Sequence, residues 1–520
     1  MTERGLSRRA LLVGVGAAGG AGAMFAAMSA LGLAPGSHDT PAFDAPAPGD
    51  FALRGRAAAR VVVLGAGVAG LTCAYELGKA GYDCVVLEAR DRVGGRNLTL
   101  RGGDTLPEIG GETQTAKFGE DVYFNAGPAR IAPWMVTMDY CRELGVPVEV
   151  FVNSNSSAYV YTGGMRAPVR ARTARADMYG YIAELLAKAT DAGALDKRLT
   201  EQDRERLLEF LSGFGDIGGK HTYEGSPRRG FGAWPGILPG TPLPGPGTLA
   251  EVLSAGTGRA LTMDFGFDQA APMFQPVGGM DTIVTALVKA VGEHRIKLGT
   301  RVTRITDRPG GVEVAYDGGA VTGDYCIATL PPHVLAKIPH NLGTPVTDAL
   351  RTPVPVSAGK MGLEYGRRWW ELDENIYGGS SETDLDITHI WYPSHGYHSQ
   401  RGLVVGYYAV GRHADGYARL THDQRRARAL TQGKKIHGEL YRTGLLSSMS
   451  IEWRRQPHIE GAWVAWPSHD GGFTLLQRPA GRVYFAGDWL TSLVAWQAGA
   501  MESARKVVTE LHTRALARPG

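Results

Sequence analysis

The sequence predicts an α/β protein whose principal domain contains a doubly wound parallel sheet. Four aliphatic residues, Val61–Leu64, lead directly into the glycine-spaced turn GAGVAG, and a second apolar strand, DCVVLEA, follows one helix later. Apolar runs without alternation are typical of strands that are buried on both faces of a parallel sheet. The 520 residues leave room for two or three domains and a large core.

Composition and charge narrow the functional class. The hydrophobic fraction of 43% and the charged fraction of 21% are ordinary for a folded soluble protein, and the net charge of +3 gives no reason to expect nucleic acid as a partner. The four cysteines form no CxxC pair, and each falls in an apolar helix or strand pattern. We therefore expect buried free thiols and no metal site.

The N-terminus predicts an export signal of the twin-arginine type over residues 1–38. Arg8 and Arg9 precede an uncharged run that is rich in Ala and Gly. A transmembrane helix of this length would normally contain more Leu, Ile and Phe, although an uncleaved anchor remains the alternative. Residues 39–57 are rich in Pro and Gly and are expected to form a linker. Export by this route would make the protein periplasmic or secreted.

The turn after the first strand has the spacing of a dinucleotide-binding loop. Gly65 permits the tight turn, Gly67 allows a pyrophosphate to approach the backbone, and Gly70 lets the helix pack closely on the strand. The N-terminus of that helix offers unpaired N–H groups and the positive end of its dipole to phosphates. Glu88 ends the second strand, where an acid can bind ribose hydroxyls. Together these features predict dinucleotide binding.

The loop EARDRVGGR, which starts at Glu88 and ends at Arg96, distinguishes between two cofactors. A nicotinamide dehydrogenase has no need of a basic, glycine-paired loop directly after the ribose acid, whereas this loop resembles the second signature of flavin-dependent amine oxidases. The motifs NAGPAR, QPVGGMD, ATLPP and YFAGDWL…AWQAGA follow in order. From about Arg60 to Leu516 the chain resembles the flavin monoamine oxidase family, and most closely the secreted bacterial L-amino-acid oxidases.

The resemblance implies a fold with three parts. An FAD-binding, Rossmann-like domain would comprise the discontinuous segments 58–115, 270–345 and 452–516. A mixed-sheet substrate-binding domain would comprise 116–150 and 346–451. A helical subdomain with a Pro/Gly-rich loop would span 151–269. A homodimer is also expected.

The resemblance further implies FAD held without a covalent bond. Some relatives link the flavin to a cysteine before the final turn, and PSHDGGFTLLQ contains none at that place. Asp488 stands where many relatives have Glu, so its reach towards a ribityl hydroxyl is shorter. The residues implied for cofactor binding are Gly65, Gly67, Val68, Ala69, Gly70, Glu88, Ala89, Arg90, Gly95, Arg96, Gly127, Pro128, Ala129, Arg130, Val302, Gly487, Asp488, Ala495, Trp496, Gln497, Ala498 and Ala500.

Two polar side chains are implied to hold the substrate carboxylate. Arg130, in GPAR, would clamp it with paired guanidinium donors, although a surface position or a contact with FAD alone is the alternative. Tyr408 would share the carboxylate through its hydroxyl. On a strand its neighbour Tyr407 must point to the opposite face, so only one of the two can face the pocket.

The remaining implied catalytic residues surround the reacting amine. Lys360, in an apolar strand, would hold a water near flavin N5, because burying an unpaired lysine is otherwise costly. Trp496 would form an aromatic wall over the amine, beside Ala495, unless it merely packs in the core. The sequence does not specify which amino-acid side chain the substrate carries. Six tryptophans are candidates for an aromatic pocket: Trp234, Trp369, Trp370, Trp391, Trp466 and Trp489.

The activity implied by the resemblance is oxidative deamination of L-amino acids to 2-oxo acids, ammonia and hydrogen peroxide, by hydride transfer to flavin N5 and reoxidation by O2. An amino-acid 2-monooxygenase, which yields an amide, is the nearest alternative. An amine or polyamine oxidase is another, for which Arg130 would be an unusual pocket residue. A flavoprotein that serves only as a binding module would need no carboxylate clamp.

Overall fold

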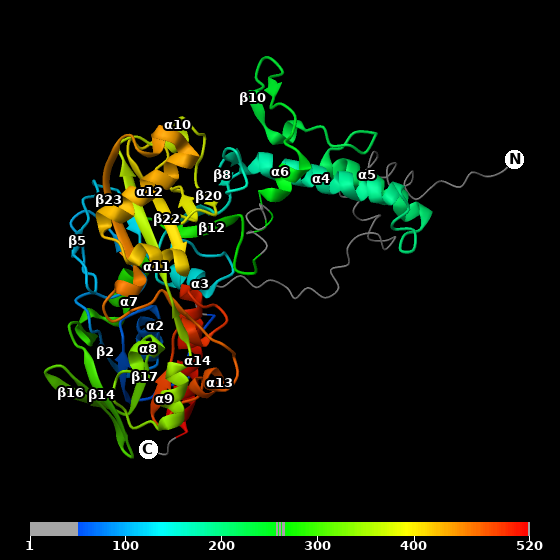
Figure 1. The fold of residues 1–520 in the computed structure, drawn as a ribbon. Helices are drawn as coiled ribbons and strands as arrows, with labels where there is room; N and C mark the ends of the chain where they lie inside the picture. The colour runs from blue at the N-terminus through cyan, green and yellow to red at the C-terminus, as the bar shows by residue number, and fades with distance from the viewer. Residues whose placement is uncertain (1–49, 256–257, 259–261, 263–265, 518–520) are drawn as a thin grey trace. The chain divides into compact units, whose positions relative to one another are not determined.

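The predicted strand–helix–strand unit lies at the start of the described chain (Figure 1). The structure is a computed structural model that describes residues 50–255, 258, 262 and 266–517. Strand β1 (Arg60–Leu64), helix α2 (Val68–Lys79) and strand β2 (Asp83–Leu87) follow one another with the glycine turn between the first two. The predicted signal segment 1–38 and most of the linker 39–57 lie outside the described residues.

Segments far apart in the sequence form one parallel sheet. Its order is β13-β2-β1-β17-β25, and every neighbouring pair is parallel. The added strands are β13 (Ile296–Lys297), β17 (Tyr325–Ala328) and β25 (Val483–Phe485). This arrangement confirms the predicted fold class, a doubly wound sheet built from discontinuous segments.

The parallel sheet is covered on both faces, as the unbroken apolar runs predict. Val61 and Val63 pack into a core with helices α2, α7 and α14, whereas Val62 and Leu64 pack into a second core on the opposite face. The second core includes a three-stranded antiparallel sheet and two short helices. The covering elements are α7 (Thr282–Val291), α14 (Gln497–Leu516), β14 (Val302–Arg308), β15 (Gly311–Tyr316), β16 (Gly319–Gly323), α9 (Thr344–Arg351) and α13 (Gly472–Leu476).

A second, seven-stranded sheet has the order β23-β19-β22-β21-β20-β8-β9. It is mixed, because β20 pairs with β8 in parallel and the other neighbours are antiparallel. Its strands are β8 (Tyr159–Tyr161), β9 (Val169–Arg170), β19 (Ala358–Tyr365), β20 (Ser380–Thr383), β21 (His389–Trp391), β22 (Gly402–Val410) and β23 (Leu445–Glu452). Helix α12 (His422–His437) contacts β22 and β23.

Two long helices, α4 (Ala171–Asp191) and α5 (Glu201–Gly215), pack against each other through a small core of Ala183, Ala187 and Leu211. Thr200 begins α5 with a capping box, in which its hydroxyl accepts from the Asp203 N–H. The remaining elements are β3 (Thr99–Leu100), β4 (Thr105–Leu106), β5 (Gln114–Thr115), β6 (Phe124–Asn125), α3 (Val136–Glu143), β7 (Val148–Val152), β10 (Phe231–Ala233), β11 (Thr241–Pro242), α6 (Leu249–Ser254), β12 (Pro272–Pro276), α8 (Pro332–Leu335), β18 (Val354–Val356), α10 (Trp369–Leu372), α11 (Arg412–Ala418) and β24 (Trp463–Ala465).

One further sequence prediction concerns the cysteines. All four cysteines are buried and free, as predicted. Within the described ranges, no helix combines the length and the apolarity needed to cross a bilayer.

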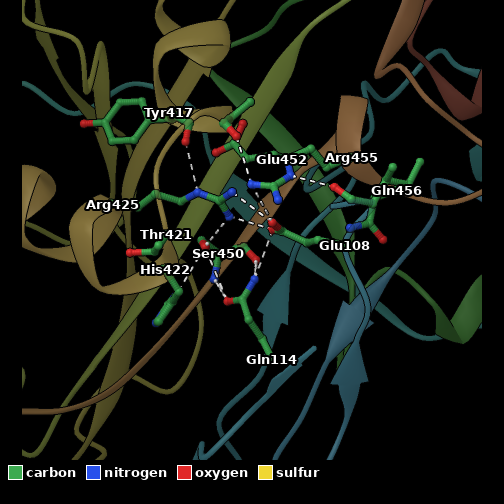
Figure 2. Close-up of polar contacts among 12 residues, drawn as sticks. Glu108, Gln114, Tyr417, Thr421, His422, Arg425, Ser450, Glu452, Arg455 and Gln456 are labelled. Atoms are coloured by element: carbon green, nitrogen blue, oxygen red, sulfur yellow. Dashed lines mark hydrogen bonds and ion pairs between the residues drawn. The ribbon is translucent and has the colours of Figure 1, made fainter. Parts of the chain in front are cut away.

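A buried ionic network joins α12 to strand β23 of the seven-stranded sheet (Figure 2). Arg425, which is fully buried, donates to both carboxylate oxygens of Glu108 at 2.6 and 2.9 Å, to Ser450 Oγ at 3.1 Å and to the Tyr417 carbonyl oxygen at 3.1 Å. Nearby, Glu452 accepts from the Tyr407 hydroxyl at 2.7 Å. Because buried charges must be paired to persist, this network ties the β4–β5 hairpin and α12 to strand β23.

Glu452 gives a first testable prediction. Burial raises the pKa of its carboxyl to about 8, against the smaller opposing effect of Arg425. An acid with a raised folded-state pKa adds stability that is present below the unfolded pKa and is lost as pH rises towards the folded value. Glu452→Gln cannot ionise at this position. We therefore expect its free energy of unfolding to rise relative to that of the parent by about 1 kcal/mol for each pH unit between pH 5 and 8.

Urea denaturation at several pH values measures this difference. The exposed Glu205→Gln on α5 is the matched control and should leave the pH slope of the parent unchanged. A constant offset between Glu452→Gln and the parent across pH 5 to 8 would contradict the assignment.

Candidate active site

One cavity of about 830 Å³ brings together the residues of the separate sequence motifs. It lies at the carboxyl ends of the parallel strands, where Gly65 follows β1, Glu88 follows β2, Thr329 follows β17 and Gly487 lies just beyond β25. This edge is where open α/β sheets bind their ligands. All of the residues implied for the cofactor line the cavity except Gly70 and Ala498.

The two exceptions are packed behind the cavity wall. A Cβ on Gly70 would collide with the carbonyl oxygen of Gly65, so this glycine lets α2 pack closely on the end of β1. Ala498 is buried near the start of α14. Both residues support the wall without lining it.

Two helices begin at the cavity, and neither has a side-chain cap from a described residue at its N-terminus. Val68 and Ala69 open α2, and Gln497 opens α14. The first N–H groups of a helix lack partners within the helix and carry the positive end of its dipole. The cavity therefore offers two sites for anionic groups, which fits a pyrophosphate at α2.

Glu88, which the sequence predicts to bind a ribose, is fixed in place directly after β2. Glu88 accepts from the backbone N–H of Ala66 at 2.8 Å and from that of Arg90 at 3.1 Å. Ala89 and Val302 line the cavity beside it. A carboxylate held by backbone donors on a cavity wall can accept further hydrogen bonds from ribose hydroxyls.

Arg96 and Asp488, predicted separately, form an ion pair with each other. Arg96 also donates to the Ala462 carbonyl oxygen at 2.8 Å, and Asp488 accepts from the Ala495 N–H at 3.0 Å. Ala495 has a φ of 69°, in the left-handed region that is unfavourable for a residue with a Cβ. The Asp488 contact holds this backbone next to Trp496.

Arg130 lies at another part of the cavity, between two aromatic rings. Its Cζ is 4.8 Å from the ring centroid of Trp391 and 5.7 Å from that of Trp496. One guanidinium nitrogen donates to Gln269 Oε1 at 3.3 Å, while its Nε has no described partner. No carboxylate of the described residues forms an ion pair with it, and burial lowers its pKa. Among the residues that the structure describes, this cation thus lacks a counterion.

Lys360 and Tyr408 face the same cavity from adjacent strands, as register partners on β19 and β22. Lys360 Nζ lies 4.8 Å from the Tyr408 ring centroid and donates to the carbonyl oxygens of Gly127 and Asn125. Burial and, to a smaller extent, Arg130 lower the pKa of Lys360 to about 7. Tyr407 points to the opposite face, where it donates to Glu452.

Several residues that line the cavity were not predicted from the sequence. Asp268 and Gln269 contact Trp496 and Arg130 respectively, but they lie in no motif, between the helical segment and β12. Of the six candidate tryptophans, Trp391 lies against Arg130, the predicted carboxylate clamp. Trp391 also lines a small neighbouring cavity of about 60 Å³, which shares Ala129, Arg130, Lys360 and Tyr408 with the large one.

Sequence comparison places the chain among oxidases. Residues 68–512 match the family model described as flavin containing amine oxidoreductase. The chain is 26% identical over 486 residues to a putative L-amino-acid oxidase, YobN, of Bacillus subtilis (strain 168), covering 87% of this chain and 94% of that one. It is 27% identical over 479 residues to an L-amino-acid oxidase of Notechis scutatus scutatus, covering 88% and 87% of the two chains.

The fold is shared with solved amine oxidases. A cyclohexylamine oxidase from Brevibacterium oxydans superposes with a TM-score of 0.60 at 16% identity, covering 88% of this chain and 100% of that one. A putrescine oxidase bound to putrescine gives a TM-score of 0.56 at 19% identity, covering 89% and 99%. The family match spans most of the chain, and the cavity is lined by the first residues of α2 and α14 and by Glu88, groups that can bind phosphates and a ribose. The chain therefore belongs to the flavin-containing amine oxidoreductase family, and its cofactor is FAD.

Proposed function

We propose that this protein oxidatively deaminates L-amino acids to 2-oxo acids, ammonia and hydrogen peroxide. Its relatives named L-amino-acid oxidases support the proposal, since their similarity extends over more than four fifths of the chain. The observation that carries it is Arg130, a half-buried guanidinium in the cavity wall without an ion-pair partner among the described residues.

The chemistry of Arg130 explains why an amino acid is the preferred substrate. Removing a cation from water is costly unless a counterion or several acceptors replace the water. Gln269 Oε1 supplies one neutral acceptor. A substrate carboxylate would supply the missing charge and could accept two parallel hydrogen bonds from the guanidinium fork. A simple amine carries no such group and would leave the cation uncompensated.

The other residues orient the substrate and shape its surroundings. When bound, FAD supplies the hydride acceptor and passes the electrons to dioxygen. The Tyr408 hydroxyl can share the carboxylate with Arg130, because both line the same wall. Trp496 and Trp391 cover the guanidinium with apolar rings, which excludes water and strengthens the carboxylate contact. Lys360 holds the Gly127–Arg130 turn through the Gly127 carbonyl oxygen.

A peroxide-release screen with the FAD-loaded protein tests the proposal. The twenty L-amino acids, their D-forms and a set of simple amines are assayed for peroxide, and the products are identified by mass. Release with L-amino acids and formation of the 2-oxo acid would support it. An amide product would indicate a 2-monooxygenase, and turnover of amines alone would indicate an amine oxidase.

We predict that FAD is held without a covalent bond. Denaturation of the purified yellow protein in acid should release free FAD into the supernatant, because the segment before Gly487 contains no cysteine to form a thioether. The absorbance of the supernatant and of the redissolved pellet measures how the flavin is distributed between the two fractions. Flavin that stays with the pellet would contradict the prediction.

A further inference from the structure

Opposite charges flank Trp496 at the substrate end of the large cavity. The guanidinium carbon of Arg130 lies 5.7 Å from the indole centroid, and the indole Nε1 donates to Asp268 Oδ2 at 2.9 Å. All three side chains line the cavity. Arg130 and Asp268 form no ion pair with each other or with any other side chain in the described ranges. The two charges are therefore both available to a ligand that spans the indole.

The position of Asp268 is determined by neighbouring contacts. The next residue, Gln269, accepts from Arg130 at 3.3 Å and from Asn153 Nδ2 at 3.1 Å, and Asn153 is fully buried. The Asn153 N–H donates to the Ala271 carbonyl oxygen at 3.0 Å, which ties this segment to the C-terminal end of β7. With the indole contact on one side and Gln269 on the other, the Asp268 carboxylate has a defined place in the wall.

We propose that Asp268 makes the site selective for L-amino acids whose side chain ends in a cation, such as lysine, ornithine and arginine. The proposal rests on the function proposed above, in which Arg130 holds the α-carboxylate. The aliphatic stem of a basic side chain then lies along the indole, and its terminal cation reaches Asp268. A cation paired with a carboxylate gives a charge-assisted hydrogen bond, roughly twice as strong as a neutral one.

The α-ammonium group of the substrate is a poor match for Asp268. It is attached one carbon from the carboxylate that Arg130 holds, whereas Asp268 contacts the Nε1 edge of the indole and lies beyond ion-pair distance of Arg130. A neutral side chain would cover Asp268 without giving it a counterion, which is unfavourable for a carboxylate. An acidic side chain would be repelled. The expected order is basic, then neutral, then acidic.

The matched pair L-lysine and L-norleucine tests the proposal, because the two differ chiefly in the terminal ammonium group. In the FAD-loaded parent, kcat/KM should favour L-lysine by about 10-fold or more. Asp268→Asn should remove that preference, and Asp268→Glu should keep part of it, which separates a charge effect from misfolding. Asp423→Asn, on the exposed surface of α12, is the charge-matched control and should keep the parent ratio. An unchanged ratio in Asp268→Asn would overturn the proposal.

Binding of two unreactive acids separates this inference from the proposed function. Hexanoate and 6-aminohexanoate lack an α-amino group, so calorimetry under anaerobic conditions reports recognition alone. The parent should bind 6-aminohexanoate about 10-fold more tightly than hexanoate, and Asp268→Asn should bind them equally. If no L-amino acid is oxidised but this difference appears, the proposed function fails and the role of Asp268 stands. Equal binding by the parent overturns the role of Asp268.

Discussion

Arg130→Ala is expected to raise KM for L-amino acids by about 100-fold or more while the purified protein stays yellow. The guanidinium lines the cavity and has no ion-pair partner among the described residues, and a substrate carboxylate would supply that partner. Removing it leaves that carboxylate desolvated between Trp391 and Trp496 without a counterion. Steady-state kinetics and the FAD content per chain measure the two parts of this result.

A substrate comparison makes the test specific for the carboxylate. In the parent, L-leucine should be preferred strongly over 3-methylbutylamine, which has the same carbon skeleton without the carboxylate. In Arg130→Ala the two should approach equality. Arg367→Ala, an exposed arginine paired with Asp373, is the matched control and should leave KM unchanged. A parent-like KM in Arg130→Ala would show that another group holds the carboxylate.

The parts of the fold that were predictable are those in which neighbouring residues decide the structure. The run at Val61–Leu64 has no polar position, so it must be covered on both faces, and the structure places a separate core on each side. The spacing of Gly65, Gly67 and Gly70 was predictable because each position needs glycine for a local reason: a tight turn, the approach of a pyrophosphate, and close packing of the helix on the strand. Glu88 directly follows β2, and the residue after a parallel strand lies at the carboxyl edge of the sheet.

The parts that were not predictable depend on tertiary contacts. Asp488 and Arg96 were each assigned to the cofactor, but no local pattern shows that residues 392 positions apart pair with each other. Asp268 and Gln269 enter the cavity from a segment without motif or periodicity. Lys360 donates to backbone carbonyl oxygens. Because every residue has a carbonyl oxygen, the sequence does not show which ones lie near Lys360.

Lys360→Met should raise the stability of the FAD-free protein at pH 7 by several kcal/mol while lowering its activity after loading. Burial lowers the pKa of this lysine from 10.5 to about 7, so the folded protein binds the proton less tightly than the unfolded chain does. Each tenfold change in that equilibrium is worth about 1.4 kcal/mol. Methionine has similar length and no charge, so it avoids this cost and forgoes the hydrogen bond to Gly127, worth about 1 kcal/mol.

The pH dependence separates the cost of the charge from a general packing gain. In the parent, the contribution of Lys360 to stability should become less unfavourable between pH 7 and pH 10.5, because over that range the unfolded lysine binds a proton that the folded one has released. The advantage of Lys360→Met should therefore be largest at or below pH 7 and shrink as pH rises towards 10.5. Lys289→Met on the exposed side of α7 is the control and should show no such trend. An advantage that stays constant with pH would mean that Lys360 has an ordinary pKa, and the cavity would then hold two full positive charges, at Lys360 and Arg130.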